Sequence, residues 1–301
     1  MSLVVTDTNW AVHEFADADL GDERRTTRLV ELACALGQHP TAALPEACGT
    51  GSMLKAAYRF FDNDGIAPQD ILQSHVEATY TRLGAVPVVL AVQDTTEVNW
   101  TRHPATQGLG PLGHTACHGL LVHTTLAITP ERVPLGLLAQ QVWARAPADV
   151  GKRARRKQLP ISQKESQQWL HSLDAVYTAH DCCPTTRLVS VGDREADVYD
   201  VLAAPRPAGV DLLIRAAWDR CVQGAERYVW ATVTAQPVGA HLQLKVPRRG
   251  PQAARDATLA LRFCALTLRP PRHRQREGLP VVTLWAVPVQ EVEPPAGVTP
   301  I

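Results

Sequence analysis

Two acidic motifs, each close behind a run of aliphatic residues, constrain the fold of this 301-residue chain most strongly. Asp94 follows the apolar run 86–92, and Asp193 follows the run 188–191. Short runs rich in valine and leucine are typical of buried strands. An aspartate at the end of such a strand is held at the rim of a sheet, and neighbouring strands would bring the two carboxylates together. Paired carboxylates suit Mg²⁺ or Mn²⁺, the metals of phosphoryl-transfer sites.

Composition excludes several classes of protein. The chain is 45% hydrophobic and 20% charged, as in ordinary globular domains. A formal net charge of zero argues against a wholly basic nucleic-acid binder, but basic residues are concentrated in the segment 245–276. No apolar run predicts a membrane span or a signal peptide, and seven cysteines without CxxC spacing predict reduced thiols. We therefore expect a cytoplasmic protein without a membrane partner.

The segment 18–62 predicts three short helices. Asp19 or Asp22 can cap the first, Pro45 can open the second, and Ser52 can cap the third. The third helix is expected to bury an apolar face, and its residues are Leu54, Ala57, Tyr58 and Phe61. Short helices joined by a glycine turn resemble a helix-turn-helix unit.

Basic residues repeat at helical spacing in this segment. The predicted DNA-binding residues are Arg24, Arg25, Arg28, Lys55 and Arg59. They can contact phosphates or base edges, or they can belong to solvated helix faces. The segment 152–157 carries five basic residues in six positions, and it is either a solvated loop or a second contact with the DNA backbone.

The middle of the chain predicts an α/β fold with a mixed sheet. Expected strands cover 86–93, 119–128, 133–143, 188–191 and 210–214, and expected helices cover 70–84, 162–180 and 195–204. This is the strand order of the ribonuclease-H-like fold. Glu195 and Asp197 fall in the first turn of the last expected helix, where the helix dipole stabilises acidic side chains. Residues 220–290 predict an inserted β subdomain, with one of its strands at 227–230.

Several of these motifs together resemble a known family. The stretches 20–29 and 56–61, the Asp94 string and the stretch 193–197 are similar to the IS-four family of DDE transposases, of the Tn-five type. The resemblance implies a helical domain at 1–66 that binds transposon-end double-stranded DNA. It also implies a ribonuclease-H-like catalytic core at 67–216 and an inserted β subdomain at 217–301.

The same resemblance implies roles for individual residues. Asp94 and Asp193 would be the first two catalytic, metal-binding acids, with Mg²⁺ or Mn²⁺ as cofactor and no small-molecule cofactor. His123 matches a histidine of the relatives, and Lys164 and Arg194 are further accessory candidates. A bacterial host, where the protein associates with the nucleoid when bound to DNA, and a dimer with a second transposase chain are also implied.

The sequence departs from the family pattern in one respect. The relatives carry a third acid on a final core helix, within the motif Tyr-x2-Arg-x3-Glu-x6-Lys, and this sequence does not contain it. We therefore expect a chain truncated before that helix, in which the metal is weakly held. Three readings stay open: a DNA-binding remnant or regulator, an active metal-dependent nuclease or transposase with a displaced third ligand, and a chain without a stable fold.

Overall fold

The computed structural model describes residues 10–113, 116–146, 159–224, 226–248, 250, 252–298 and 300. The basic segment 152–157 lies outside these described residues. The chain divides into two compact units. The first comprises Met1–Asp193 and Arg206–Ile214, and the second comprises Arg194–Pro205 and Arg215–Ile301.

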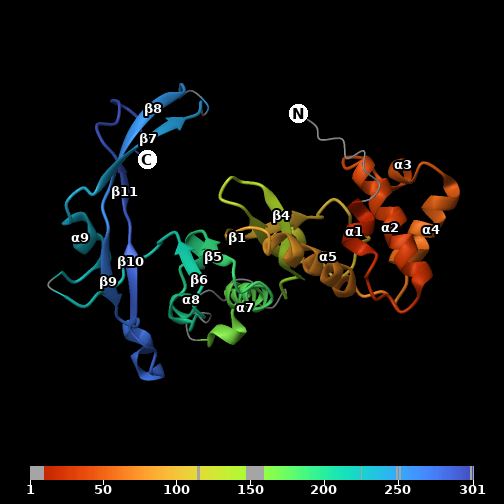
Figure 1. The fold of residues 1–301 in the computed structure, drawn as a ribbon, viewed down its shortest axis with the longest axis horizontal. Coiled ribbons are helices and arrows are strands. Elements are labelled where there is room, and N and C mark those ends of the chain that lie inside the picture. Colours follow the sequence, from red (N-terminus) through yellow and green to blue (C-terminus); the bar gives the residue numbers. More distant parts are fainter. Residues whose placement is uncertain are drawn as a thin grey trace. The chain divides into compact units, whose positions relative to one another are not determined.

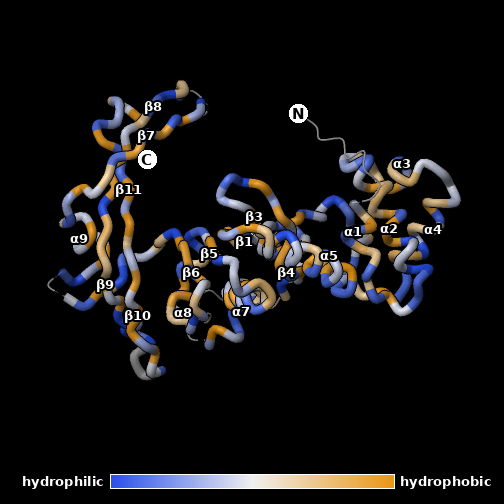
Figure 2. The backbone as a smooth tube through the Cα atoms, viewed as in Figure 1, coloured by the Kyte–Doolittle hydropathy of each residue, from blue (hydrophilic) through white to orange (hydrophobic). Residues whose placement is uncertain are grey.

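Five helices form the first part of the first unit (Figure 1). They are α1 (Trp10–Phe15), α2 (Glu23–Gln38), α3 (Leu44–Cys48), α4 (Gly51–Phe61) and α5 (Pro68–Leu83). Apolar and polar residues are interleaved along them (Figure 2). Their shared core consists of Ala18, Leu20, Leu29, Leu32, Cys48, Ala57 and Phe60.

The helix ends follow local sequence chemistry. The Asp22 side chain caps α2 by accepting a hydrogen bond from the backbone N–H of Arg24. Pro45 lies in the first turn of α3, and Gly49 ends that helix with a φ of 66°, a conformation that glycine tolerates. The predicted helix starts at Asp22 and Pro45 are therefore confirmed.

Helix α4 differs from the prediction in its cap and in its buried face. Thr50 caps it, rather than Ser52. Phe60 is buried, whereas Tyr58 and Phe61 are 55% and 60% exposed. The predicted face included Tyr58 and Phe61, so this part of the prediction is wrong. In a helix of three turns, more than one set of apolar residues has helical spacing. Tertiary packing therefore decides which of these faces is buried.

A mixed sheet completes the first unit. Its strands are β1 (Val88–Asn99), β2 (Gly110–Pro111), β3 (His118–Ile128), β4 (Pro134–Trp143), β5 (Arg187–Gly192) and β6 (Val210–Ile214). The order is β2-β3-β1-β5-β6, with β4 also paired to β3. The pairs β1–β3 and β3–β4 are antiparallel, whereas β1–β5 and β5–β6 are parallel. The predicted α/β fold with a mixed sheet is confirmed.

Strand β1 is longer than predicted. Its parallel pairing with β5 ends at Gln93 opposite Gly192, but its antiparallel pairing with β3 continues to Asn99. Asp94 therefore lies within a strand rather than at its last residue, because β3 continues to supply hydrogen-bond partners. Asp193 directly follows β5, as predicted.

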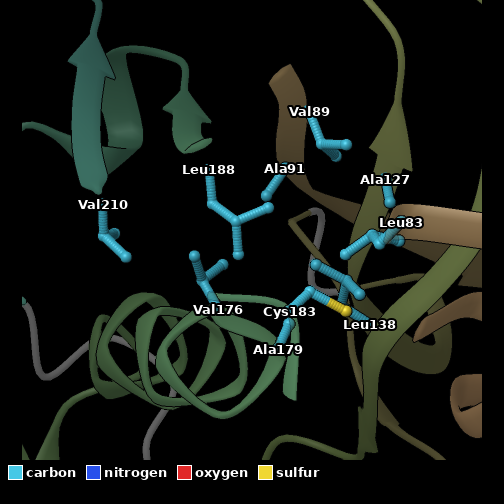
Figure 3. Packing of buried hydrophobic residues seen from close by; sticks show 10 residues of the cluster. All are labelled: Leu83, Val89, Ala91, Ala127, Leu138, Val176, Ala179, Cys183, Leu188 and Val210. Atoms are coloured by element: carbon cyan, nitrogen blue, oxygen red, sulfur yellow. The ribbon is translucent and has the colours of Figure 1, made fainter. Parts of the chain in front are cut away.

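Helix α7 (Gln167–Cys182), which follows the short 3-10 helix η2 (Ile161–Gln163), covers one face of the sheet. Figure 3 shows its Val176 and Ala179 beside Leu188 of β5 and Ala91 of β1. The core is completed by Leu83, Val89, Ala127, Leu138, Cys183 and Val210. Burial of this apolar surface is the main force that holds the helix on the sheet.

A polar network around Glu14 ties α1 to α5 and β4. The Glu14 carboxylate accepts hydrogen bonds from Arg82 Nη1 at 2.6 Å and from His75 Nδ1 at 2.7 Å. His75 Nε2 in turn accepts from the backbone N–H of Leu137 at 2.9 Å, and Arg82 Nε donates to the carbonyl of Leu135. The helical segment and the sheet of this unit are thus joined by charge-assisted hydrogen bonds.

The second unit contains short strands and helices. Its strands are β7 (Ala240–Val246), β8 (Arg255–Leu261), β9 (Cys264–Leu268), β10 (Val282–Ala286) and β11 (Val289–Glu291). Its helices are η3 (Arg194–Ala196), α8 (Tyr199–Ala203), α9 (Val229–Thr234) and η4 (Arg272–Glu277). The strands form two sheets, β11-β8-β7 and β10-β9.

Two predictions for this unit are wrong in detail. The expected strand at 227–230 overlaps α9, in which Val229 and Val233 are buried four residues apart, a helical spacing. The expected helix 195–204 is divided into η3 and α8. None of the helices in the described ranges has the length and apolar character that a membrane-spanning segment requires.

Candidate nucleic-acid interface and acidic site

One face of α4 combines basic and aromatic side chains. Lys55, Tyr58 and Arg59 are exposed and lie at helical spacing, so they project from the same side of the helix. They border an open hollow of about 690 Å³, whose lining is Gly51, Leu54, Lys55, Tyr58, Arg59, Phe61 and Asp62. Cationic groups beside exposed rings suit contact with phosphates and base edges.

Two arginines of α2 form ion pairs at the surface. The Arg24 side chain is 90% exposed and lies 2.7 Å from Asp22. Hydrogen bonds from Arg24 lower the pKa of Asp22 to about 2. Arg28 pairs with Glu31 at 2.6 Å. Exposed pairs of this kind are weak, so both guanidinium groups can exchange these partners for a phosphate.

Arg25 has a different environment. Its Nη1 donates hydrogen bonds to the carbonyls of Leu20 and Gly65, each at 2.9 Å. These bonds connect the start of α2 to the loop that follows α4. Of the five predicted DNA-binding residues, Arg24, Lys55 and Arg59 are exposed. Arg28 is half-buried, with its Nη1 also 3.5 Å from Met53 Sδ, and Arg25 holds the helical segment together.

The two aspartates occupy neighbouring positions on the sheet. Strands β1 and β5 pair in parallel as far as Gln93 and Gly192, and Asp94 and Asp193 are the next residue of each. Both aspartates are exposed. Because side chains alternate along a strand, Asp94 projects on the face opposite to Gln93, away from α7. The structure thus brings the predicted acidic pair together at the level of the backbone.

His123 lies close to this pair but on the covered face. Its ring is fully buried, contacts Trp169 edge-to-face at a centroid distance of 4.7 Å, and has Nδ1 2.7 Å from Thr95 Oγ1. Burial lowers the pKa of His123, and the Asp94 carboxylate opposes this shift. Burial therefore disfavours the charged form of this imidazole.

The donor set at the two aspartates suits a hard divalent ion. Carboxylate oxygens are the ligands that Mg²⁺ and Mn²⁺ prefer. Within the described ranges, however, no group of three His, Cys, Asp or Glu side chains has the geometry to hold a metal. Glu97 lies on the α7 face of β1, where it accepts from the backbone N–H of Gly113 at 2.9 Å. The pair thus has the right chemistry for a metal but few ligands.

The remaining accessory candidates lie further along the chain. Lys164 is half-buried directly after η2, and Arg194 is exposed in η3 of the second unit.

Asp197 has a structural role that the sequence did not suggest. Its carboxylate is buried and accepts hydrogen bonds from the backbone N–H groups of Ala217 at 2.7 Å and Trp218 at 3.0 Å. Arg220 adds a salt bridge at 2.6 Å. The predicted location in the first turn of a helix is wrong, because Asp197 lies between η3 and α8. Its partners are 20 to 23 residues away, a separation that no local motif signals.

Comparison with known families adds one finding. Residues 7–66 match the family model of transposase DNA-binding domains. The match covers α1 to α4, including the exposed basic and aromatic face of α4. It supports a transposase-related protein whose N-terminal helical segment binds DNA.

Proposed function

We propose that this chain binds double-stranded DNA at transposon ends through its N-terminal helical segment, with α4 facing the DNA. The exposed face of Lys55, Tyr58 and Arg59, inside the segment that matches transposase DNA-binding domains, is the observation that carries the proposal. The two cations neutralise phosphates and set the position of the helix. Tyr58 and Phe61 offer apolar contact to base edges or to thymine methyl groups.

The test compares DNA affinity between charge variants by fluorescence anisotropy. Lys55→Ala with Arg59→Ala should weaken binding about tenfold or more and reduce the slope of log affinity against log salt by about two. Arg187→Ala is the matched control. Arg187 is also exposed, but it lies at the start of β5, at the opposite end of that strand from Asp193, and pairs with Asp211. Equal losses for both variants would contradict a specific role for α4.

We further propose that the sheet unit is a ribonuclease-H-like core of the IS-four type. The strand order β4-β3-β1-β5-β6, antiparallel in its first three strands and parallel in its last three, supports this assignment. The adjacent positions of Asp94 and Asp193 support it as well, since acids on those two central strands are what the resemblance implies.

A second candidate function is metal-dependent cleavage of DNA strands. Asp94 and Asp193 would hold Mg²⁺ or Mn²⁺, which supplies an activated water and neutralises charge on the phosphate. With two carboxylates in place, we expect weak binding of the ion and impaired cleavage. Titration with Mn²⁺ followed by electron paramagnetic resonance tests this, since Asp94→Asn should abolish binding and Glu97→Gln should not.

Binding without cleavage would make the chain a DNA-binding regulator or remnant. A nicking assay on supercoiled DNA with Mg²⁺ separates the two readings. Nicking that Asp94→Asn and Asp193→Asn both remove supports the enzyme. Specific DNA binding without nicking supports the regulator, which could act by pairing with a second transposase chain.

A further inference from the structure

A layer of buried polar side chains lies between the sheet and α7. Its members and their exposed fractions are Gln93 (4%), His123 (0%), Thr125 (0%), Ser172 (0%) and Ser190 (1%). Further down the same face, the core is apolar, with Val89, Ala91 and Leu188 fully buried. The polar layer therefore begins where the strands approach Asp94 and Asp193.

Strand register places these groups side by side. Gln93 and Thr125 are direct partners across β1 and β3, and His123 lies two residues from Thr125 on the same face. His123 contacts Trp169 of α7, and Ser172 follows Trp169 by three residues on the buried face of that helix. The layer thus lies between three strands of the sheet, β1, β3 and β5, and helix α7.

Two hydrogen bonds satisfy only part of this layer. Gln93 Nε2 donates to Ser190 Oγ at 2.6 Å, and His123 Nδ1 is bonded to Thr95 Oγ1. Within this layer, four buried atoms have no hydrogen-bond partner among the described residues: Gln93 Oε1, His123 Nε2, Thr125 Oγ1 and Ser172 Oγ. Gln93 Oε1 accepts hydrogen bonds, the Thr125 and Ser172 hydroxyls both donate and accept, and His123 Nε2 accepts when the ring proton is on Nδ1.

Buried polar groups that lack hydrogen-bond partners are not stable in a dry core. Buried polar atoms without partners are unfavourable, and native proteins satisfy nearly all of them with protein groups or internal water. Internal water typically makes about three hydrogen bonds to such atoms. A water molecule can donate two hydrogen bonds and accept two, so it can bond to the Gln93 amide oxygen and also to the Thr125 and Ser172 hydroxyls.

We propose that this layer is a binding site for internal water, held by Gln93 Oε1, Thr125 Oγ1, His123 Nε2 and Ser172 Oγ. The water supplies the missing hydrogen bonds of these side chains, which lie on β1, β3 and α7. Because Gln93 directly precedes Asp94, the hydrated layer fixes the segment of β1 that carries the acid. It is independent of whether the protein binds DNA or metal.

The test uses near-isosteric removal of one hydroxyl. Thr125→Val lowers the melting temperature of the full chain by about 2–4 °C if Thr125 Oγ1 is bonded to water. If the hydroxyl were dry and unpaired, the valine variant would be unchanged or more stable, because replacing an unsatisfied polar atom removes its desolvation penalty. Thr124→Val is the matched control. Thr124 lies on the opposite, partly exposed face of the same strand and should change the melting temperature by less than about 1 °C.

Two further measurements decide the point. Thr125→Val and Ser172→Ala should be less than additive in the double variant, because both bind the same water. A crystal structure should show solvent density within hydrogen-bond distance of Thr125 Oγ1 and Gln93 Oε1. Additive losses together with a density-free layer would overturn the proposal, as would a melting temperature that depends on potassium, which would indicate a bound cation instead.

Discussion

Removal of the Glu14 carboxylate should loosen the helical segment from the sheet. Glu14 of α1 binds both Arg82 and His75 of α5, which in turn bind the backbone of β4. In the Glu14→Ala variant, a guanidinium and an imidazole would lose their acceptor in a partly buried location. We therefore expect this variant to be less stable than the native chain.

The expected loss in the free energy of unfolding depends on how exposed the three side chains are. The side chains of Glu14, His75 and Arg82 are 15%, 23% and 34% exposed. Breaking a fully buried pair costs about 3–5 kcal/mol, and breaking an exposed pair costs less than about 1 kcal/mol. Since a third of Arg82 is in contact with solvent, we expect Glu14→Ala to lower the free energy of unfolding by about 2 kcal/mol. Glu14→Gln keeps the shape and an acceptor, and should cost about 1 kcal/mol.

Urea unfolding followed by circular dichroism measures these differences. Glu31→Ala is the control, because the Glu31–Arg28 pair is at the surface and should contribute about 0.5 kcal/mol or less. Hydrogen exchange should show faster exchange in α1 of the Glu14→Ala variant. If Glu14→Ala and Glu31→Ala have equal, small effects, the network does not hold α1 in place and the reasoning is wrong.

Three other predictions concern single sites. Phe60→Ala should lower the free energy of unfolding by about 3 kcal/mol or more, whereas Phe61→Ala, which removes a 60% exposed ring, should cost less than about 1 kcal/mol in the same calorimetric comparison. Arg220→Ala should cost about 3 kcal/mol, because it leaves the buried Asp197 carboxylate without its cation; a melting temperature equal to that of the native chain would contradict this. Burial lowers the pKa of His123, so the unfolded state binds its proton more tightly. The contribution of His123 to the free energy of unfolding is then fully present above its ordinary pKa of 6.5 and decreases as the pH falls below that value. Urea titrations from pH 5 to 8 should show this dependence, and His123→Gln should reduce it.

The sequence predicted the elements whose signals are local. Asp22 and Pro45 mark helix starts by their own chemistry, and the aliphatic run before Asp193 is compatible with little besides a strand. The order of strands and helices then indicated a mixed sheet, because parallel strands require crossover connections.

Features that depend on tertiary partners were not predictable. The burial of Phe60 instead of Phe61 depends on which side of α4 meets α2, and the extension of β1 beyond Asp94 depends on β3. The role of Asp197 depends on backbone N–H groups about 20 residues further along the chain. In the candidate site, the sequence supplied the two acids and the basic residues. Only the structure separated Arg25, which is bonded internally, from the exposed cations of α4.

The most direct test of the account is selection of bound sequences from a library of random DNA duplexes by the full chain at physiological salt. Recognition of transposon ends predicts enrichment of one motif, with at least about 10³-fold tighter binding than to random duplex. The enrichment should disappear with Lys55→Ala and Arg59→Ala and persist with Arg187→Ala. Binding without an enriched motif, or enrichment that survives loss of both α4 cations, would contradict the central claim.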